Sequence, residues 1–299
     1  MEERIGDKLM AITKIMTDSA SDIPAQYEAD YEIEILGFPL TIGEETYYER
    51  VDFPVKEDFY TRLYSEPKIP THAQITQMEF EEKFEEFWKK GYQNLIYVCI
   101  NSKGSNTFNS ALMAKKHFEE AHPEADFTIY ILDAKTYSYA YGYAVVEAAK
   151  KAQKGTAVKE IVAYLEDWFN SVEIYATAYS LEFAKKSGRV SSTAAFVGEL
   201  LGLKPVITFI DGDNATPAKV RGDKAVVPTL VKFAKEHIVP KTPYIILYGN
   251  NMEERDKLIK EMEKAIGYPA ADIVQIGATI SINIGANLVG IVIKGAQKH

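Results

Sequence analysis

The segment from Asn94 to Ala121 constrains the fold most strongly. Its residues Leu95 to Ile100 form an unbroken apolar run, which is typical of a strand buried on both faces of a parallel sheet. Apolar residues at helical spacing begin at Phe108 and predict a helix. The turn between them, residues 101–107, carries hydroxyl and amide side chains and opens onto the expected helix N-terminus. Backbone N–H groups at such a turn can bind a carboxylate or a phosphate, although the same residues also make an ordinary helix cap.

Strands and helices alternate along the first half of the chain. A strand is expected at 126–132, and helices are expected at 79–90, 139–153 and 158–169. This alternation predicts a parallel sheet that is covered by helices on its faces. We therefore expect an N-terminal α/β domain with a parallel sheet over residues 13–170.

The second half mixes hairpins with helices. Two strands are expected to meet at a turn over 211–214, and the segment 194–201 is expected to form a helix of small residues. The apolar segment 273–282 is predicted to be a strand. This mixture indicates a C-terminal α+β domain with a mixed sheet over residues 171–299.

Charge and composition exclude several classes of partner. The chain of 299 residues has a formal net charge of −9, which argues against nucleic acid or an anionic membrane surface as the main partner. No apolar run approaches the ~20 residues of a membrane-spanning helix, and the N-terminal residues are too charged for a signal peptide. The only cysteine is Cys99, so neither an internal disulfide nor a cysteine-based zinc site is available. We expect a cytoplasmic protein without membrane insertion.

Familiar catalytic and nucleotide-binding motifs are absent from the sequence. It contains no G-x-S-x-G, G-x-x-x-x-G-K-[ST], G-x-G-x-x-G or H-E-x-x-H pattern. We therefore expect neither a metal nor a cofactor, and no catalytic residues of these types. An enzyme for phosphoryl transfer or hydrolysis of a small molecule, with Asp18 or Asp133 as the general base, remains the alternative.

Hydroxyl-rich turns are the most suggestive polar feature of the chain. They occur at strand ends or in nearby loops: 17–21, Thr71, 102–107 and Thr136. In an open parallel sheet, ligands collect at the carboxyl ends of the strands. Arg189 follows a glycine at the end of an expected helix, where it can face an anion across the cleft or simply follow a helix cap. Hydroxyls and one arginine suit a receptor for an anion. His72 adjoins Thr71 in a loop set by Pro70, where it can lie at the rim of such a site or be an ordinary loop residue.

Several sequence motifs, in order along the chain, resemble those of the DegV family of bacterial fatty-acid-binding proteins. The first is T-D-S-A-S-D-I-P, which is similar to the family's opening T-D-S-x-[SA]-D-[IL]-P. Residues 70–72 are similar to its T-S-Q-P-S loop, and residues 101–111 to its S-S-x-L-S-G-T-Y-x-S-A turn. Residues 181–190 are similar to its L-x-Y-L-K-K-G-G-R-I segment, and residues 203–212 to its K-P-I…D-G strand and turn. Residues 277–285 are similar to its closing G…H-x-G segment. The resemblance covers nearly the whole chain.

This resemblance implies two α/β domains with a long-chain fatty acid in an apolar tunnel between them. It also implies a carrier without catalytic activity, which presents the fatty acid to a separate kinase in some members of the family. The carboxylate would meet Thr71, Ser102 and Arg189, with Ser105 and Thr107 shaping the turn. A long acyl tail can supply most of the affinity, at ~0.8 kcal/mol for each buried methylene.

The chain departs from the family pattern at one position near the expected carboxylate. Where the family has a histidine, this sequence has Asn283, which can donate a hydrogen bond but cannot carry a positive charge. The change bears on the kinase partnership more than on lipid binding. His72 is the residue that could supply an imidazole from the opposite wall.

Overall fold

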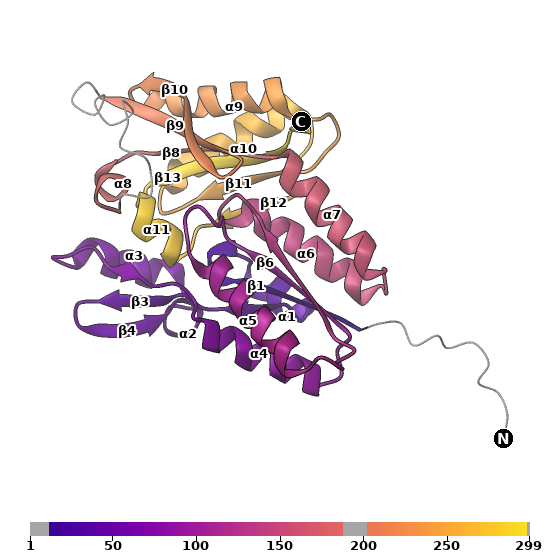
Figure 1. Ribbon diagram of the computed structural model, residues 1–299. Helices are drawn as coiled ribbons and strands as arrows, with labels where there is room; N and C mark the ends of the chain where they lie inside the picture. Colours follow the sequence, from indigo (N-terminus) through magenta and orange to yellow (C-terminus); the bar gives the residue numbers. More distant parts are fainter. Residues whose placement is uncertain (1–11, 188–201, 298–299) are drawn as a thin grey trace.

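A computed structural model of the chain describes residues 12–187 and 202–297. Figure 1 shows two parts that pack side by side, an N-terminal part over residues 12–171 and a C-terminal part over residues 172–297. The N-terminal part carries a parallel sheet and the C-terminal part a mixed sheet. The expected α/β class and the two kinds of sheet are therefore confirmed.

The parallel sheet has four strands in the order β2-β1-β6-β7. Its strands are β1 (Thr13–Asp18), β2 (Glu34–Leu36), β6 (Asn94–Cys99) and β7 (Thr128–Asp133). Every residue of β6 is buried, as the apolar run predicts, because helices cover both faces of the sheet. Because β1, β6 and β7 pair in parallel, their carboxyl ends point the same way.

Five helices accompany this sheet. They are α1 (Ala25–Asp30), α4 (Gln77–Lys89), α5 (Thr107–Ala121), α6 (Tyr139–Gln153) and α7 (Val158–Ser171). Helix α4 begins with a capping box, in which the Thr76 side chain accepts from the Glu79 N–H and the Glu79 side chain accepts from the Thr76 N–H. Helix α4 packs against α5, whereas α6 packs against β1 and α7.

A small antiparallel sheet projects from the N-terminal part. It has the order β4-β3-β5, with β3 (Pro39–Ile42), β4 (Glu45–Tyr48) and β5 (Thr71–His72). The short helices η1 (Ser19–Ser21) and α2 (Glu49–Asp52) and the longer α3 (Lys56–Ser65) belong to the same region. From this region, β5 contacts α11 (Ala278–Ile284) of the C-terminal part, and Glu49 of α2 bonds to Thr279 of α11.

The sheet of the C-terminal part has six strands in the order β10-β9-β8-β13-β11-β12. Only β11 and β12 pair in parallel; the other neighbours are antiparallel. The strands are β8 (Val172–Ala178), β9 (Leu203–Ile210), β10 (Asp213–Arg221), β11 (Tyr244–Tyr248), β12 (Asp272–Gln275) and β13 (Leu288–Lys294). The expected hairpin is β9 with β10. The helices are α8 (Glu182–Ser187), η3 (Asp223–Ala225), α9 (Val226–His237), α10 (Met252–Ile266) and α11 (Ala278–Ile284).

One sequence-based expectation is corrected here. The segment 273–282 is not one strand, because β12 ends at Gln275 and α11 begins at Ala278. The Gly277 N–H donates to Asp22 Oδ1 at 2.6 Å, so the chain leaves the sheet at this glycine. The expected helix at 194–201 lies outside the described residues.

The hydrophobic core is continuous across the boundary between the two parts. One cluster contains Val98 of β6 together with Ile174 of β8 and Leu247 of β11. A second cluster joins Leu40 of β3 to Leu288 of β13. The two parts are therefore held together by shared apolar burial, as well as by the polar contacts described below.

The position of Gly277 gives a test of this boundary. A Cβ at residue 277 would lie against Glu49 Oε1 and 2.6 Å from Asp22 Oδ1, and both carboxyl groups are buried. We expect Gly277→Ala to lower the free energy of unfolding by about 1–3 kcal/mol, the usual cost of overpacking a buried site.

Gly37→Ala is the matched control, because a Cβ there meets only ordinary van der Waals neighbours at 3.7 Å or more. Denaturant unfolding of the two variants measures the difference. Equal stability would contradict the close approach at Gly277.

Candidate functional site

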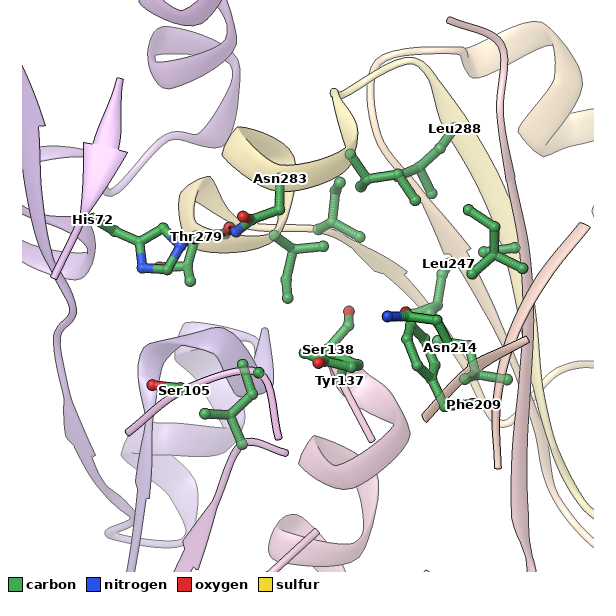
Figure 2. A pocket seen from close by; sticks show the side chains of 18 of the residues that line it. His72, Ser105, Tyr137, Ser138, Phe209, Asn214, Leu247, Thr279, Asn283 and Leu288 are labelled. Carbon is green, nitrogen blue, oxygen red and sulfur yellow. Dashed lines mark hydrogen bonds between the residues drawn. The ribbon is translucent and has the colours of Figure 1, made fainter. Parts of the chain in front are cut away.

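A cavity lies at the junction of the two parts, and both parts line it (Figure 2). The space between its lining atoms amounts to 840 Å³, including the portion that is open to solvent. The lining residues are Phe38, His72, Ile100, Gly104, Ser105, Tyr137, Ser138, Ile174, Ala176, Ile207, Phe209, Asn214, Leu247, Ile276, Thr279, Ile280, Asn283, Ile284 and Leu288.

Most of the cavity wall is apolar. The C-terminal sheet contributes alternate residues of its strands, such as Ile174 and Ala176 of β8, whereas Tyr175 between them faces the core on the other side of the sheet. Ile280 and Ile284 of α11 add a second apolar wall. None of the described lining residues is Asp, Glu, Lys or Arg, so the described wall favours an uncharged, oily ligand body.

Several polar side chains gather at one end of the cavity, whereas Ser138 and Tyr137 lie midway and Asn214 lies on the other side, beside Phe209 (Figure 2). Figure 2 shows His72, Thr279 and Asn283 together at one side of the view, with Ser105 nearby, while Leu247 and Leu288 lie toward the other side. Asn283 Nδ2 donates to the Thr279 carbonyl at 2.7 Å and to His72 Nε2 at 2.9 Å. Because an amide nitrogen only donates, His72 Nε2 accepts, which assigns its ring proton to Nδ1. The predicted imidazole and the asparagine of the opposite wall are therefore direct partners.

A smaller polar hollow adjoins this end of the cavity. It is lined by His72, Gln74, Ser102, Lys103, Gly104, Ser105 and Asn106, and it shares His72, Gly104 and Ser105 with the cavity. Across it, Lys103 Nζ bonds Asp213 Oδ2 of the C-terminal part at 2.6 Å. Asn101 Nδ2 donates to the Gly212 carbonyl at 2.8 Å. The turn between β9 and β10 is thus tied to the turn that follows β6.

The predicted site residues fall into three groups. Ser105, His72 and Asn283 line the cavity. Thr107 lies buried behind it, 2.9 Å from Ser105 Oγ, and its hydroxyl accepts from the Ile75 N–H at 3.3 Å.

Of the remaining three predicted residues, two lie outside the cavity wall and the third is not described. Ser102 borders the polar hollow and donates to Asp133 through its N–H at 3.0 Å and through its hydroxyl. The exposed Thr71 is in β5 and is not among the residues that line either hollow. Arg189 lies outside the described residues. The roles of these three stay predictions.

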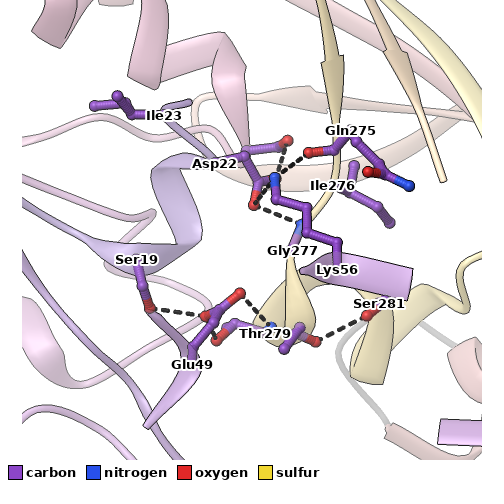
Figure 3. A network of polar contacts seen from close by, with 12 residues as sticks. Ser19, Asp22, Ile23, Glu49, Lys56, Gln275, Ile276, Gly277, Thr279 and Ser281 are labelled. Carbon is purple, nitrogen blue, oxygen red and sulfur yellow. Dashed lines mark hydrogen bonds and ion pairs between the residues drawn. The ribbon is translucent and has the colours of Figure 1, made fainter. Parts of the chain in front are cut away.

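Two buried carboxylates lie directly behind the polar end (Figure 3). Glu49 of α2 accepts from the Thr279 N–H at 3.1 Å and from its hydroxyl at 2.6 Å. Asp22 accepts from the Gly277 N–H at 2.6 Å and from the Ser138 hydroxyl at 2.5 Å, with Lys56 Nζ at 4.0 Å. Burial raises the pKa of Asp22 to about 7 and lowers that of the Lys56 ammonium.

Sequence reasoning missed Ser138 and Thr279, which line the cavity. Ser138 has a φ of +57°, a left-handed conformation that few residues other than glycine adopt, and it precedes α6. Its position two residues after the hydroxyl-rich turn at Thr136 was the available signal. Thr279 was hidden because its segment was assigned to a strand.

The carboxylates proposed for the enzymatic alternative do not line the cavity. Asp18 is fully buried and accepts from the Tyr141 hydroxyl at 2.6 Å and from the Ile100 N–H at 2.9 Å. Burial raises the pKa of Asp18 to about 6. Asp133 is occupied by Ser102 and by the Lys135 N–H. Within 12–187 and 202–297, no group of three or more histidine, cysteine or acidic residues could hold a metal ion.

Comparison with known proteins finds similarity to one protein family. The family model described as "Uncharacterised protein, DegV family" matches residues 12–295. A DegV domain-containing protein of Clostridium perfringens is 32% identical over 290 residues, which cover 95% of this chain and 98% of that protein. A DegV domain-containing protein of Caldanaerobacter subterraneus is 31% identical over 221 residues, which cover 74% of this chain and 76% of that protein.

Solved structures of similar proteins share the fold. A stearic acid-binding protein from Eubacterium ventriosum has a TM-score of 0.84 at 24% identity, covering 94% of this chain and 98% of that one. A Thermotoga maritima protein described as having a fatty acid binding function has a TM-score of 0.80 at 22% identity, covering 96% and 100%. DegV of Bacillus subtilis, a fatty acid binding protein, has a TM-score of 0.78 at 25% identity, covering 94% and 98%. Among the helices that the structure describes, none has the length and apolarity of a membrane span.

The buried acids behind the site predict how stability depends on pH. Because the pKa values of Asp22 and Asp18 are raised above the usual 3.8, the folded chain binds more protons than the unfolded chain between about pH 4 and pH 7. Their contribution to stability is therefore fully present at about pH 4 and is lost as the pH rises through 6 and 7. For Asp22 the loss between pH 5 and pH 8 is about 2–3 kcal/mol.

Asp22→Asn is expected to flatten this pH dependence, because an amide does not ionise. Chemical denaturation at pH 5 and pH 8 measures it. Glu124→Gln, at an exposed carboxylate, should keep the dependence of the unmodified chain. A variant with Asn at position 22 that loses as much stability as the unmodified chain would contradict the assignment.

Proposed function

The chain belongs to the DegV family, and on that premise we propose that it binds a long-chain fatty acid in the cavity between its two parts. The observation that carries the proposal is the division of the cavity into an apolar body and one polar end. A fatty acid has the same division. Proteins of the same fold, including the stearic acid-binding protein of Eubacterium ventriosum, are described as fatty acid-binding.

The acyl tail would lie against the C-terminal sheet and α11. Burial of each methylene stabilises the complex by about 0.8 kcal/mol, so the tail supplies most of the affinity. Phe209 and Tyr137, whose ring centroids are 4.5 Å apart across the boundary, would cover one side of the tail. The apolar wall is therefore the source of affinity, and the polar end sets the direction in which the chain enters.

The carboxyl group would lie at the polar end. Ser105, His72 and Asn283 line it, and Thr107 supports Ser105 from behind. Ser102 borders the adjoining hollow, so it is suited to a second contact with the head group, and Thr71 and Arg189 remain proposed parts of the same set. In this arrangement Asn283 orients the His72 ring, which supplies the imidazole that the family pattern places at position 283.

We propose that the protein acts as a cytoplasmic carrier and not as an enzyme. Its domains would span 13–170 and 171–299, with the ligand between them. A head group next to the polar hollow is accessible to another protein, which suits presentation of the fatty acid to a separate kinase. The enzymatic alternative is not favoured, because Asp18 and Asp133 are occupied by hydrogen bonds away from the cavity.

Native mass spectrometry of the gently purified protein tests the proposal directly. We expect a bound fatty acid in the unmodified chain and a sharply reduced amount in Ala176→Phe, because the added ring fills the apolar part of the cavity. Ile210→Phe, at an exposed position of β9, is the control and should retain the lipid. A folded chain that neither retains nor takes up a fatty acid would refute the function.

Two double variants test the head-group residues. His72→Ala with Ser105→Ala removes polar groups from the cavity end. Ser102→Ala with Arg189→Ala removes two further residues that are proposed for the head group. Each is expected to weaken the binding of stearic acid about tenfold or more, since each removes hydrogen bonds to a carboxyl group.

Isothermal titration with stearic acid measures these affinities, and thermal melts exclude unfolding. If one pair binds stearic acid as tightly as the unmodified chain does, that pair does not belong to the head-group site.

A further inference from the structure

Glu49 is a buried acid that lines a different hollow from the lipid cavity, yet it contacts the cavity wall. It comes from α2 of the N-terminal part and is 5% exposed. Its two oxygens accept three hydrogen bonds from side chains and backbone (Figure 3): Ser19 Oγ at 2.7 Å, Thr279 N at 3.1 Å and Thr279 Oγ1 at 2.6 Å. Because Thr279 belongs to the C-terminal part, Glu49 joins the two parts by hydrogen bonds at the start of α11.

The contact with Thr279 continues to the polar end of the cavity. Thr279 is 1% exposed and lines the cavity, and its carbonyl accepts from Asn283 one helical turn later at 2.7 Å. Asn283 in turn donates to His72 at 2.9 Å. A single hydrogen-bonded path therefore runs from Glu49 through Thr279 and Asn283 to His72, and each step fixes the orientation of the next side chain.

The same contact decides what Thr279 can offer to a ligand. A hydroxyl has one hydrogen and two acceptor positions, and the hydrogen of Thr279 is committed to Glu49. Toward the cavity, Thr279 can therefore only accept. Ser138 donates to Asp22 at 2.5 Å and is in the same state while that carboxyl group is ionised. The carboxylates behind the cavity thus make cavity hydroxyls into acceptors.

We infer that Glu49 is a positioning residue of the lipid site, which holds Thr279 as a hydrogen-bond acceptor for a head group that carries a hydrogen, such as an undissociated carboxylic acid or an alcohol. The inference rests on the proposed function. Lys56 is the charged group that faces the same pair of acids: its Nζ lies 4.0 Å from Asp22 and donates to the Gln275 carbonyl. The ligand itself faces none of these charges directly, because neither Glu49, Asp22 nor Lys56 lines the cavity.

The substitution Glu49→Gln tests this role with little change of shape. A glutamine keeps one oxygen and places an NH₂ group where the second oxygen accepts, so at least one of the three donors loses its acceptor and faces another donor. The probes are myristic acid, myristyl alcohol and methyl myristate. They share one tail. The alcohol has a hydrogen to donate, the methyl ester has none, and myristic acid has one only while its carboxyl group is protonated. Affinities are measured by displacement of a fluorescent fatty-acid analogue.

We expect Glu49→Gln to weaken the binding of myristyl alcohol about tenfold, the change that corresponds to one hydrogen bond of a charged network, and to leave the binding of methyl myristate within about twofold. An equal loss for myristic acid would show that it binds in its undissociated form. Thr279→Val, which removes the hydroxyl and keeps the shape, should show the same pattern. The double variant should lose no more than either single variant, because Glu49 acts through Thr279.

Asp272→Asn is the matched control. Asp272 also joins the two parts, accepting from the Tyr27 hydroxyl at 2.7 Å and the Tyr139 hydroxyl at 3.1 Å, but neither partner belongs to α11. Its variant should bind all three probes as the unmodified chain does.

Two results would overturn the inference. One is an equal loss of affinity for the alcohol and the ester in Glu49→Gln, which would make Glu49 a purely structural residue. The other is unchanged affinity for all probes in that variant. If the unmodified chain bound none of the three probes, the proposed function itself would fail, so the two failures are distinguishable.

Discussion

The capture of Gly277 and Thr279 by two buried carboxylates is the interaction on which the rest of the structure depends. Asp22 and Glu49 come from the N-terminal part and bind backbone N–H groups at the point where β12 gives way to α11. Breaking such a contact lowers the stability of the fold, because a buried carboxylate that loses its hydrogen-bond donor is also shielded from water and has no other partner. The start of α11 is therefore fixed relative to the N-terminal sheet.

The shape of the cavity follows from this fixed helix. The N-terminus of α11 is bound to the N-terminal part, whereas the strands on either side of it, β12 and β13, belong to the C-terminal sheet. In this position α11 presents Ile280 and Ile284 to the cavity. The apolar core continues across the boundary on either side, so the two parts enclose a hollow and do not slide past each other. A ligand in that hollow meets apolar side chains along most of its length.

The physical basis of the proposed function is that one end of the cavity is apolar and the other carries polar groups. Apolar burial is strong but does not distinguish the direction of a long chain, whereas a few polar groups at one end do. The hydrogen-bonded path behind those groups keeps His72 and Asn283 in one arrangement. A carrier needs both properties, because it must hold the tail firmly and leave the head group in a defined place.

The sequence by itself determined the features that depend on local pattern. The apolar run of β6, the turn after it and helix α5 were predictable, because burial and helical spacing are written in neighbouring residues. Ser105, His72 and Asn283 could be named as candidates from motifs, and all three line the cavity. Only the tertiary structure brought Asn283 Nδ2 within 2.9 Å of His72 Nε2, although the two residues are 211 positions apart in the sequence. It also decided that the apolar segment after Gln275 is a helix, because Asp22 and Glu49, far away in the chain, bind its first N–H groups and draw it out of the sheet.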